Sequence, residues 1–482
     1  MEPRRQFEPF QKLGDRIFRV PRIEPWRIPL ALVQTPKFRS ISVAVVIWGF
    51  AIIIAIGAVL LMLPISSQDH TWTSFPDALF TATSATCVTG LTVHDTATYW
   101  SGFGQAVILL LIQVGGFGFM TSASLLLLAF GRSVGLREKL LIGESLGMQK
   151  LGGLVALLMG IAFFTIFFEG IGAVIFYIRF SQEFSSPATA LWHSLFHAVS
   201  SFCNAGFDLS GTEGGGSLMR YNNDPLVILT TAALIILGGI SFLVAWDVFR
   251  KRSFKGLTLD SKLVIVMTIA LLVLGTIILL AMEYTNESTL GPMPFPQKVL
   301  NAFFQSVTAR TAGFNVISVP MMTAYSLFFT IMLMFIGAAS GSTAGGVKVS
   351  TFGVLIATVW SSLRGKEYAQ AFGRELRPQQ IHRALAVAML ALGLVGVVTL
   401  ILTITETGKG FDFIQILFET VSAFGTVGLS TGITGALTLA GKFIIIVTMF
   451  AGRLGPLTLA LSLVQRQRTT EYRYPQDQVR IG

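Results

Sequence analysis

The sequence predicts an all-α polytopic membrane protein with four tandem helix–pore-loop–helix repeats, comprising eight membrane spans and four re-entrant pore helices around a central pore. Three observations predict this class: an apolar composition, eight long apolar segments with basic connections on one side, and a fourfold repeat in the connections on the other side. Soluble globular domains lack the first two features.

The composition is that of a membrane protein. Of the 482 residues, 52% are hydrophobic and 12% are charged, whereas soluble domains carry about a quarter charged residues. The mean hydropathy is +0.69. The two cysteines, Cys87 and Cys203, are too few for a disulfide framework or a metal site. Residues 1–40 are polar and basic, and we expect no cleavable signal there.

Eight apolar segments are long enough to cross a bilayer of about 30 Å. They lie near 42–64, 103–130, 152–178, 225–248, 262–282, 325–362 (interrupted), 383–404 and 443–465. The connections on one side, with both termini, hold 27 of the 35 lysines and arginines. The outer connections hold six, namely Arg179, Arg220, Lys298, Arg310, Lys409 and Lys442.

This asymmetry predicts cytoplasmic N- and C-termini in a multi-pass protein of the cell inner (plasma) membrane. It also explains the net charge of +10 without nucleic acid. The expected organisation is a cytoplasmic arm (1–40), repeat 1 (41–131), repeat 2 (152–249), repeat 3 (262–363, with an intramembrane loop at 337–348), repeat 4 (381–466) and a cytoplasmic tail (467–482).

The four outer connections share one pattern. Each has a phenylalanine, a polar residue, a small residue, then Val or Thr, then a hydroxyl residue; the phenylalanines are Phe80, Phe196, Phe304 and Phe418. A glycine follows the hydroxyl by five or six residues, at Gly90, Gly206, Gly313 and Gly428. The period is about 110 residues, which indicates an internal repeat. The apolar stretches are too short to cross, so we predict re-entrant helices.

Four such loops meeting at one axis can line a cation pathway. A dehydrated cation is recoordinated by rings of backbone carbonyls, and glycine adopts the required backbone freely. The short helices also direct their partially negative C-termini at this point. The alternative is that these glycines only allow close helix packing. The predicted cation ligands are backbone carbonyls of four tetrapeptides: Val88-Thr89-Gly90-Leu91, Asn204-Ala205-Gly206-Phe207, Thr311-Ala312-Gly313-Phe314 and Thr426-Val427-Gly428-Leu429.

With these motifs, nearly all of residues 40–465 resembles the Trk/Ktr/HKT superfamily of potassium transporters, most closely its bacterial KtrB branch. The segments that carry the resemblance are 85–91, 202–207, 311–315, 425–430, 341–348 and 452–456. In plant relatives a serine in place of the first filter glycine accompanies sodium transport. All four glycines are present here, so the resemblance favours potassium.

The resemblance implies further features that the residues alone do not give. It implies a homodimer in which each subunit has its own pore. It also implies a cytoplasmic Rossmann-type, KtrA-like regulatory ring that binds the nucleotide, so that no cofactor is expected on this chain. The lipid bilayer is the remaining partner, and no nucleic acid is expected.

The sixth span is interrupted at the depth of the bilayer centre. About 12 apolar residues run from Tyr325 to Ile336, and the small, flexible stretch 337–346 follows before helix resumes near Lys348. Irregular backbone at this depth must face water or be buried in protein. The alternatives are a mobile gate and a passive kink; the resemblance assigns a gating loop here. The predicted gate residues are Gly341, Ser342, Thr343, Ala344, Gly345, Gly346, Lys348 and Arg453.

Arg453 lies near the centre of the last span. A mid-membrane arginine is costly unless it faces a polar interior, and its five donors suit the carbonyls of an irregular loop. We predict that it bonds the loop in a closed state and raises the barrier to cations; snorkelling to an interface is the alternative. For Glu169 and Asp247 we expect pairing with neighbouring helices or snorkelling to an interface rather than a place in the ion path. Cys87 and Cys203 are expected to pack behind the filter.

Three functional classes remain: a gated potassium uptake pore, a transporter or symporter of the same fold that also uses sodium, and a membrane-embedded enzyme acting on a lipid-linked substrate. The enzyme is disfavoured because the acidic residues form no cluster that could hold a metal or act as an acid–base pair.

Overall fold

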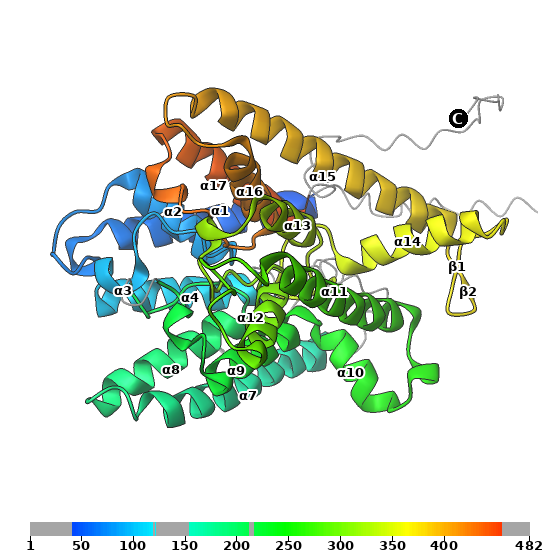
Figure 1. Ribbon diagram of the computed structural model, residues 1–482, viewed down its shortest axis with the longest axis horizontal. Helices are drawn as coiled ribbons and strands as arrows, with labels where there is room; N and C mark the ends of the chain where they lie inside the picture. The colour runs from blue at the N-terminus through cyan, green and yellow to red at the C-terminus, as the bar shows by residue number, and fades with distance from the viewer. Residues whose placement is uncertain (1–40, 119–120, 122–153, 212–215, 456–482) are drawn as a thin grey trace, which may run out of the picture. The chain divides into compact units, whose positions relative to one another are not determined.

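The computed structural model describes residues 41–118, 121, 154–211 and 216–455. Figure 1 shows a helical protein, in which the described strands are confined to one hairpin of β1 (Gln370–Ala371) and β2 (Arg374–Glu375). In chain order the α-helices are α1 (Ile41–Met62), α2 (Phe75–Thr86), α3 (Thr96–Tyr99), α4 (Gly102–Phe117), α7 (Leu154–Phe180), α8 (Pro187–Phe202), α9 (Pro225–Gly239), α10 (Phe242–Lys251), α11 (Leu259–Glu283), α12 (Phe295–Thr308), α13 (Ala324–Phe335), α14 (Val349–Leu363), α15 (Pro378–Thr405), α16 (Phe413–Gly425) and α17 (Leu439–Leu454). Single 3-10 turns are η1 (Pro64–Ser66), η2 (Met219–Tyr221), η3 (Phe254–Gly256), η4 (Val319–Met321) and η5 (Thr434–Ala436).

Among the described residues, α7, α11 and α15 are each long and apolar enough to cross a membrane alone. Shorter apolar helices include α4, α13, α14 and α16, together with residues 46–62 of α1. Large apolar side chains such as Phe163 and Ile166 on α7 are exposed, at 71% and 65%. Apolar helices that expose such side chains are typical of proteins whose outer surface faces lipid.

The predicted span at 225–248 is wrong as a single helix. It consists of α9 and α10, which meet at an angle of 92°. Gly238 allows close packing there, because a Cβ on it would collide with the carbonyl oxygen of Phe202. Ser241 has a left-handed φ of 65° and interrupts the helix before α10 begins. The interrupted sixth span lies as expected, since α13 ends at Phe335 and α14 begins at Val349.

Four short helices, α2, α8, α12 and α16, precede the four glycine loops. Proline stands in the first turn of α2, α8 and α12, where its fixed φ favours helix initiation. The fourth, α16, begins with a capping box formed by Asp412 and Gln415. The motif phenylalanines are fully buried; they are Phe80, Phe196, Phe304 and Phe418. The shared pattern therefore encodes a buried anchor on each short helix.

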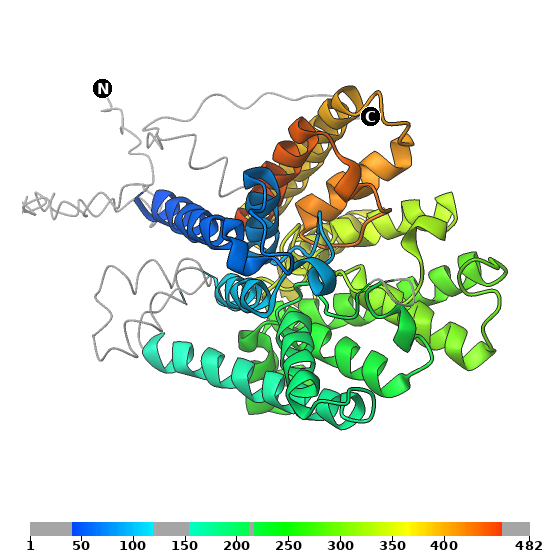
Figure 2. The same cartoon turned by 90° about the vertical axis from the view of Figure 1, so that its left-hand side faces the viewer.

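The helices close into a ring. The helix that follows each glycine loop packs against the short helix of the next repeat: α4 against α8, α9 against α12, α13 against α16, and α17 back against α2. Figure 2 shows the corresponding helices following one another around a common centre, from blue through teal and green to orange. Where α17 meets α2 and completes the ring, the Lys442 ammonium lies 2.7 Å from a carboxylate oxygen of Asp77.

Candidate functional site

The four loops that follow the short helices have the same backbone conformation. In each, the first residue of the tetrapeptide has a left-handed φ, with values of 57° at Val88, 59° at Asn204, 73° at Thr311 and 50° at Thr426. The glycine two residues later also has positive φ, between 71° at Gly206 and 93° at Gly428. This alternation turns successive carbonyls to one side of the chain. Left-handed backbone at a non-glycine residue is uncommon, so its recurrence in all four loops indicates a shared constraint.

The four glycines stand next to one another around a closed circle. A Cβ built on Gly90 would lie 2.5 Å from the carbonyl oxygen of Ala205, and one on Gly206 would lie 2.7 Å from that of Ala312. The same relation holds between Gly313 and the carbonyl of Val427, and between Gly428 and the carbonyl of Thr89. Four carbonyl oxygens, one from each loop, therefore alternate with four glycines around a closed circle.

The hydroxyl residue of each repeat holds its own loop. Ser84 and Ser422 accept hydrogen bonds from the amides of Gly90 and Gly428, each at 3.1 Å. Ser200 donates to the carbonyl of Phe207 at 2.6 Å. In the third repeat, Thr308 donates in the same way to the carbonyl of Phe314 at 2.7 Å. The recurring hydroxyl in the sequence pattern thus fixes the backbone whose carbonyls line the circle.

The structure brings together all sixteen tetrapeptide residues that the sequence singled out. Their side chains pack outwards into the protein, and the non-glycine members are buried. The free thiols of Cys87 and Cys203 are buried just before the first and second tetrapeptides, where packing behind the loops was expected. Binding of K+ at these carbonyls stays a prediction.

A cavity of about 440 Å³ is lined by the four glycines and by residues that follow them in the chain. The residue two positions after each glycine lines it; these residues are Thr92, Asp208, Asn315 and Ser430. Asp208 is the only carboxylate among the four, and burial raises its pKa to about 7. Sequence reasoning missed Asp208. The repeat alignment could have identified it, because this position is polar in every repeat.

The irregular segment between α13 and α14 packs against the start of the fourth tetrapeptide. A Cβ on Gly345 would collide with the side chain of Thr426, the first residue of the fourth tetrapeptide. The ends of the segment are joined to each other, since the Gly337 amide donates to the carbonyl of Val347 at 2.8 Å. The Ala339 amide donates to the carbonyl of Gly239, at the end of α9, at 3.0 Å.

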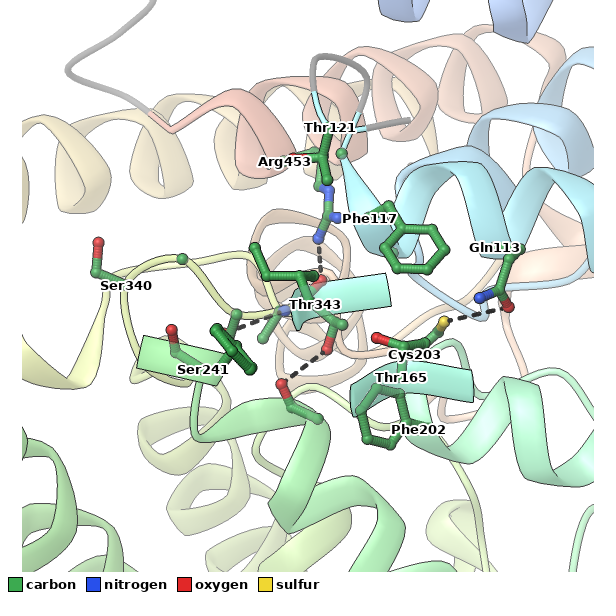
Figure 3. Close-up of a pocket in the computed structure, with 18 of the residues that line it drawn as sticks. Gln113, Phe117, Thr121, Thr165, Phe202, Cys203, Ser241, Ser340, Thr343 and Arg453 are labelled. Atoms are coloured by element: carbon green, nitrogen blue, oxygen red, sulfur yellow. Dashed lines mark hydrogen bonds between the residues drawn. The ribbon is translucent and has the colours of Figure 1, made fainter. Parts of the chain in front are cut away.

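Two positively charged side chains donate hydrogen bonds to backbone carbonyls of this segment. The Lys348 ammonium donates to the carbonyl of Ala344 at 2.5 Å. The Arg453 guanidinium donates to the carbonyl of Thr343 and, through its other terminal nitrogen, to that of Gly115 on α4. Figure 3 shows Arg453 directed at Thr343 across the cavity wall. Arg453 therefore ties the segment to two neighbouring helices, as a closing contact requires; a gating role stays a prediction.

A cavity of about 280 Å³ lies beside this segment. Its lining includes Ser340 to Ala344, Lys348, Arg453, Cys203 and Ser241. Polar groups from α4, α7 and α17 face it together with the segment (Figure 3). The irregular backbone of the segment is thus bordered by a cavity whose lining mixes polar groups with apolar side chains, and a membrane protein tolerates irregular backbone where it lines a cavity or is buried in protein.

Arg310, which was counted with the outer connections, is buried in the re-entrant part of its connection. It is 7% exposed, and its guanidinium lies 3.5 Å from the carbonyl of Gly337. The reason is that Arg310 immediately precedes the third tetrapeptide, at the buried end of α12. Charge counting along the sequence cannot separate a re-entrant helix from an exposed loop.

The two acidic residues expected to pair with neighbouring helices do so. Glu169 accepts from Gln113 at 3.4 Å and from the Cys203 thiol at 3.7 Å. Asp247 forms an ion pair with Lys251 at 2.8 Å and accepts from Ser261 at 2.7 Å. Neither carboxylate is among the residues that line the two cavities.

Comparisons with known proteins agree on one family. The TrkH family, described as cation transport protein, matches residues 40–471. The chain is 45% identical over 434 residues to the Ktr system potassium uptake protein B of Bacillus subtilis, a match that covers 90% of this chain and 95% of that protein. It is 41% identical over 439 residues to the potassium/sodium uptake protein NtpJ of Enterococcus hirae, covering 90% of this chain and 96% of that protein.

Among solved structures, the fold is similar to that of the potassium transporter TrkH from Vibrio parahaemolyticus. The TM-score is 0.67 at 20% sequence identity, and the match covers 89% of this chain and 86% of that chain. The likeness shows a common helical membrane-transporter fold.

Proposed function

Because the chain belongs to the TrkH family of cation transport proteins, we propose that it is the potassium-translocating subunit of a KtrB-type uptake system. The observation that carries the proposal is the closed circle of four glycines and four carbonyl oxygens. The family consists of membrane transporters, so the alternative of an enzyme acting on a lipid-linked substrate is excluded.

The circle supplies the chemistry of a selectivity filter. A cation that sheds its water needs oxygen ligands from several directions, and four converging backbones provide them. The C-terminal ends of α2, α8, α12 and α16 add a negative potential at the same centre. The hydroxyl anchors hold the carbonyls at fixed separations, and the number and field strength of these carbonyls then favour one cation over another.

The segment at 337–348 is the gate in this proposal. It closes the pathway below the fourth tetrapeptide, and Arg453 holds it while placing a positive charge on the route of the cation. Opening requires that the bonds from Arg453 and Lys348 break and that the segment withdraws into the neighbouring cavity of about 280 Å³.

The wider assembly is also part of the proposal. It has four repeats with eight spans and four re-entrant helices, cytoplasmic termini, a homodimer with one pore per subunit, and a Rossmann-type regulatory ring that binds the nucleotide. The subunit names of the Ktr relatives support a multi-subunit system. Dependence on sodium is a second candidate, favoured by the potassium/sodium uptake relative.

The direct test is potassium uptake by a potassium-uptake-deficient bacterial strain at low external potassium. The protein is expressed with and without a regulatory ring subunit, and its amount in the membrane is measured in each case. We expect growth and rubidium uptake to be restored when both subunits are present. If neither is restored at equal membrane expression, the transported ion is not potassium.

Asp208 makes uptake dependent on external pH. Its carboxyl has a pKa raised to about 7, so it is ionised and attracts cations above this pH and is neutral below it. Lowering the external pH from 8 to 6 is therefore expected to reduce uptake about two- to fivefold at low potassium. Asp208→Asn should remove this dependence and give the low rate at both pH values.

The matched control is Asp69→Asn, which removes an exposed carboxylate that does not line the cavity. This variant should keep the pH dependence of the wild type. Equal pH profiles for wild type and Asp208→Asn would show that another group titrates.

A further inference from the structure

Helix α10 exposes an apolar, aromatic face. Trp246 is 53% exposed and Phe249 is 66% exposed. Their rings form a continuous row with Phe242, with centroids 6.1 Å apart between Phe242 and Trp246 and 6.2 Å between Trp246 and Phe249. A row of exposed aromatic rings on a short helix that ends in basic residues is typical of segments that lie in a membrane interface.

The other side of α10 is firmly held. Val244 is buried. Asp247 accepts hydrogen bonds from Ser261 at 2.7 Å and from the Thr258 amide at 2.9 Å, both at the start of α11. The aromatic face is therefore exposed because the helix is fixed in this orientation.

Basic residues continue from the end of this face. Arg250, Arg252 and Lys255 are exposed and form no ion pair among the described residues, while Lys251 is paired with Asp247. The Arg252 guanidinium stands 5.8 Å from the Phe249 ring. Three unpaired positive charges beside exposed aromatic rings are complementary to a bilayer surface that carries anionic headgroups.

The depth of α10 fits such a surface. Helix α9 has 15 residues, which at 1.5 Å per residue is about 22 Å, less than the bilayer core of about 30 Å. The 92° bend then turns α10 away from the direction of α9. A helix that turns sideways near the end of a span lies along the interface instead of leaving the membrane.

The bend between α9 and α10 also holds the proposed gate. The carbonyl of Gly239 accepts from the Ala339 amide at 3.0 Å, and that of Gly238 accepts from the Thr343 hydroxyl at 3.4 Å. A Cβ on Gly341 would lie 3.4 Å from the Ser241 hydroxyl. A displacement of α10 therefore moves the backbone groups to which the segment at 337–346 is bonded.

We propose that α10 binds the anionic headgroups of the surrounding bilayer through Arg250, Arg252 and Lys255, and that this contact sets the opening of the 337–346 segment. The effect on opening rests on the function proposed above, whereas the lipid contact does not. The two parts are therefore tested by separate measurements.

The lipid contact is measured by quenching of Trp246 fluorescence in vesicles that contain brominated phosphatidylglycerol or brominated phosphatidylcholine. The contribution of Trp246 is the difference between the protein and its Trp246→Phe variant. We expect stronger quenching by the brominated anionic lipid, and loss of this preference in the triple variant Arg250→Gln/Arg252→Gln/Lys255→Gln. Absence of quenching by either lipid, or equal quenching by the two lipids, would overturn the proposal.

The effect on opening is measured as rubidium flux in vesicles of phosphatidylcholine alone and with roughly 30% phosphatidylglycerol. We expect wild-type flux to differ by about threefold or more between the two, and the triple variant to show no difference. The control Arg374→Gln/Arg377→Gln/Arg383→Gln removes the same charge from exposed residues elsewhere and should keep the difference. If the flux of the wild type and that of the triple variant depend equally on the lipid, α10 is not coupled to opening. If no vesicle shows rubidium flux, the proposed function is contradicted, and the quenching measurement alone then tests the lipid contact.

Discussion

Gly90→Ser is expected to lower the preference for potassium over sodium by about tenfold or more. A left-handed backbone costs a residue with a Cβ about 1–2 kcal/mol, and about 1.4 kcal/mol is a factor of ten. The added Cβ would also lie 2.5 Å from the carbonyl oxygen of Ala205. The neighbouring carbonyl must therefore move, and the fixed separation of the oxygens is lost.

The measurement is competition between sodium and rubidium uptake in vesicles. Gly313→Ser should behave in the same way, because its Cβ would lie 2.7 Å from the carbonyl of Val427. Gly170→Ser is the matched control, since a Cβ there would have no neighbour within 4 Å. Unchanged selectivity in both filter variants would mean that the four loops do not select the ion.

Arg453→Gln is expected to raise flux in the absence of the regulatory subunit by about tenfold or more. The variant loses charged hydrogen bonds to the carbonyls of Thr343 and Gly115, and each such bond contributes about 1.5–3 kcal/mol. It also removes a positive charge from the proposed route of the cation. Rubidium flux into vesicles without any regulatory subunit measures this leak.

Two further variants separate the causes. Arg453→Lys keeps the charge but cannot bridge both carbonyls, so an intermediate leak is expected if the bonds hold the segment. Deletion of residues 341–346 should give a leak at least as large as that of Arg453→Gln. If flux through the arginine variants stays at the wild-type level while the deletion leaks, the segment closes the pathway without Arg453.

The part of the site that repeats could be predicted from the sequence. Each loop obeys the same steric rule, so the glycine, the hydroxyl and the buried phenylalanine recur at fixed spacing. The hydrogen bond from the Gly90 amide to the Ser84 hydroxyl thus recurs between Gly428 and Ser422. The interrupted helix before Gly337 was also visible, because a run of small residues is a poor helix former wherever it lies.

Features of the structure that occur in only one repeat could not be predicted from the repeated pattern. The bend at Ser241 lies inside an apolar run, and hydropathy reports that a segment is buried in lipid without giving its direction. Arg310 was placed by its distance along the chain, whereas its depth depends on the packing of α12. Asp208 stands two residues after the second glycine, a position that the repeat alignment marks as polar, but that Asp208 alone carries a charge there and lines the cavity is not part of the repeated pattern.

Closure of the circle by α17 against α2 has a consequence for biosynthesis. The contact between Lys442 and Asp77 joins residues that are 365 positions apart, and the fourth side of the circle comes from the last quarter of the chain. A nascent chain that has inserted three repeats has no enclosed pathway. With the circle as the proposed ion pathway, synthesis of this protein therefore adds ion permeability to the membrane only when the final repeat has folded against the first.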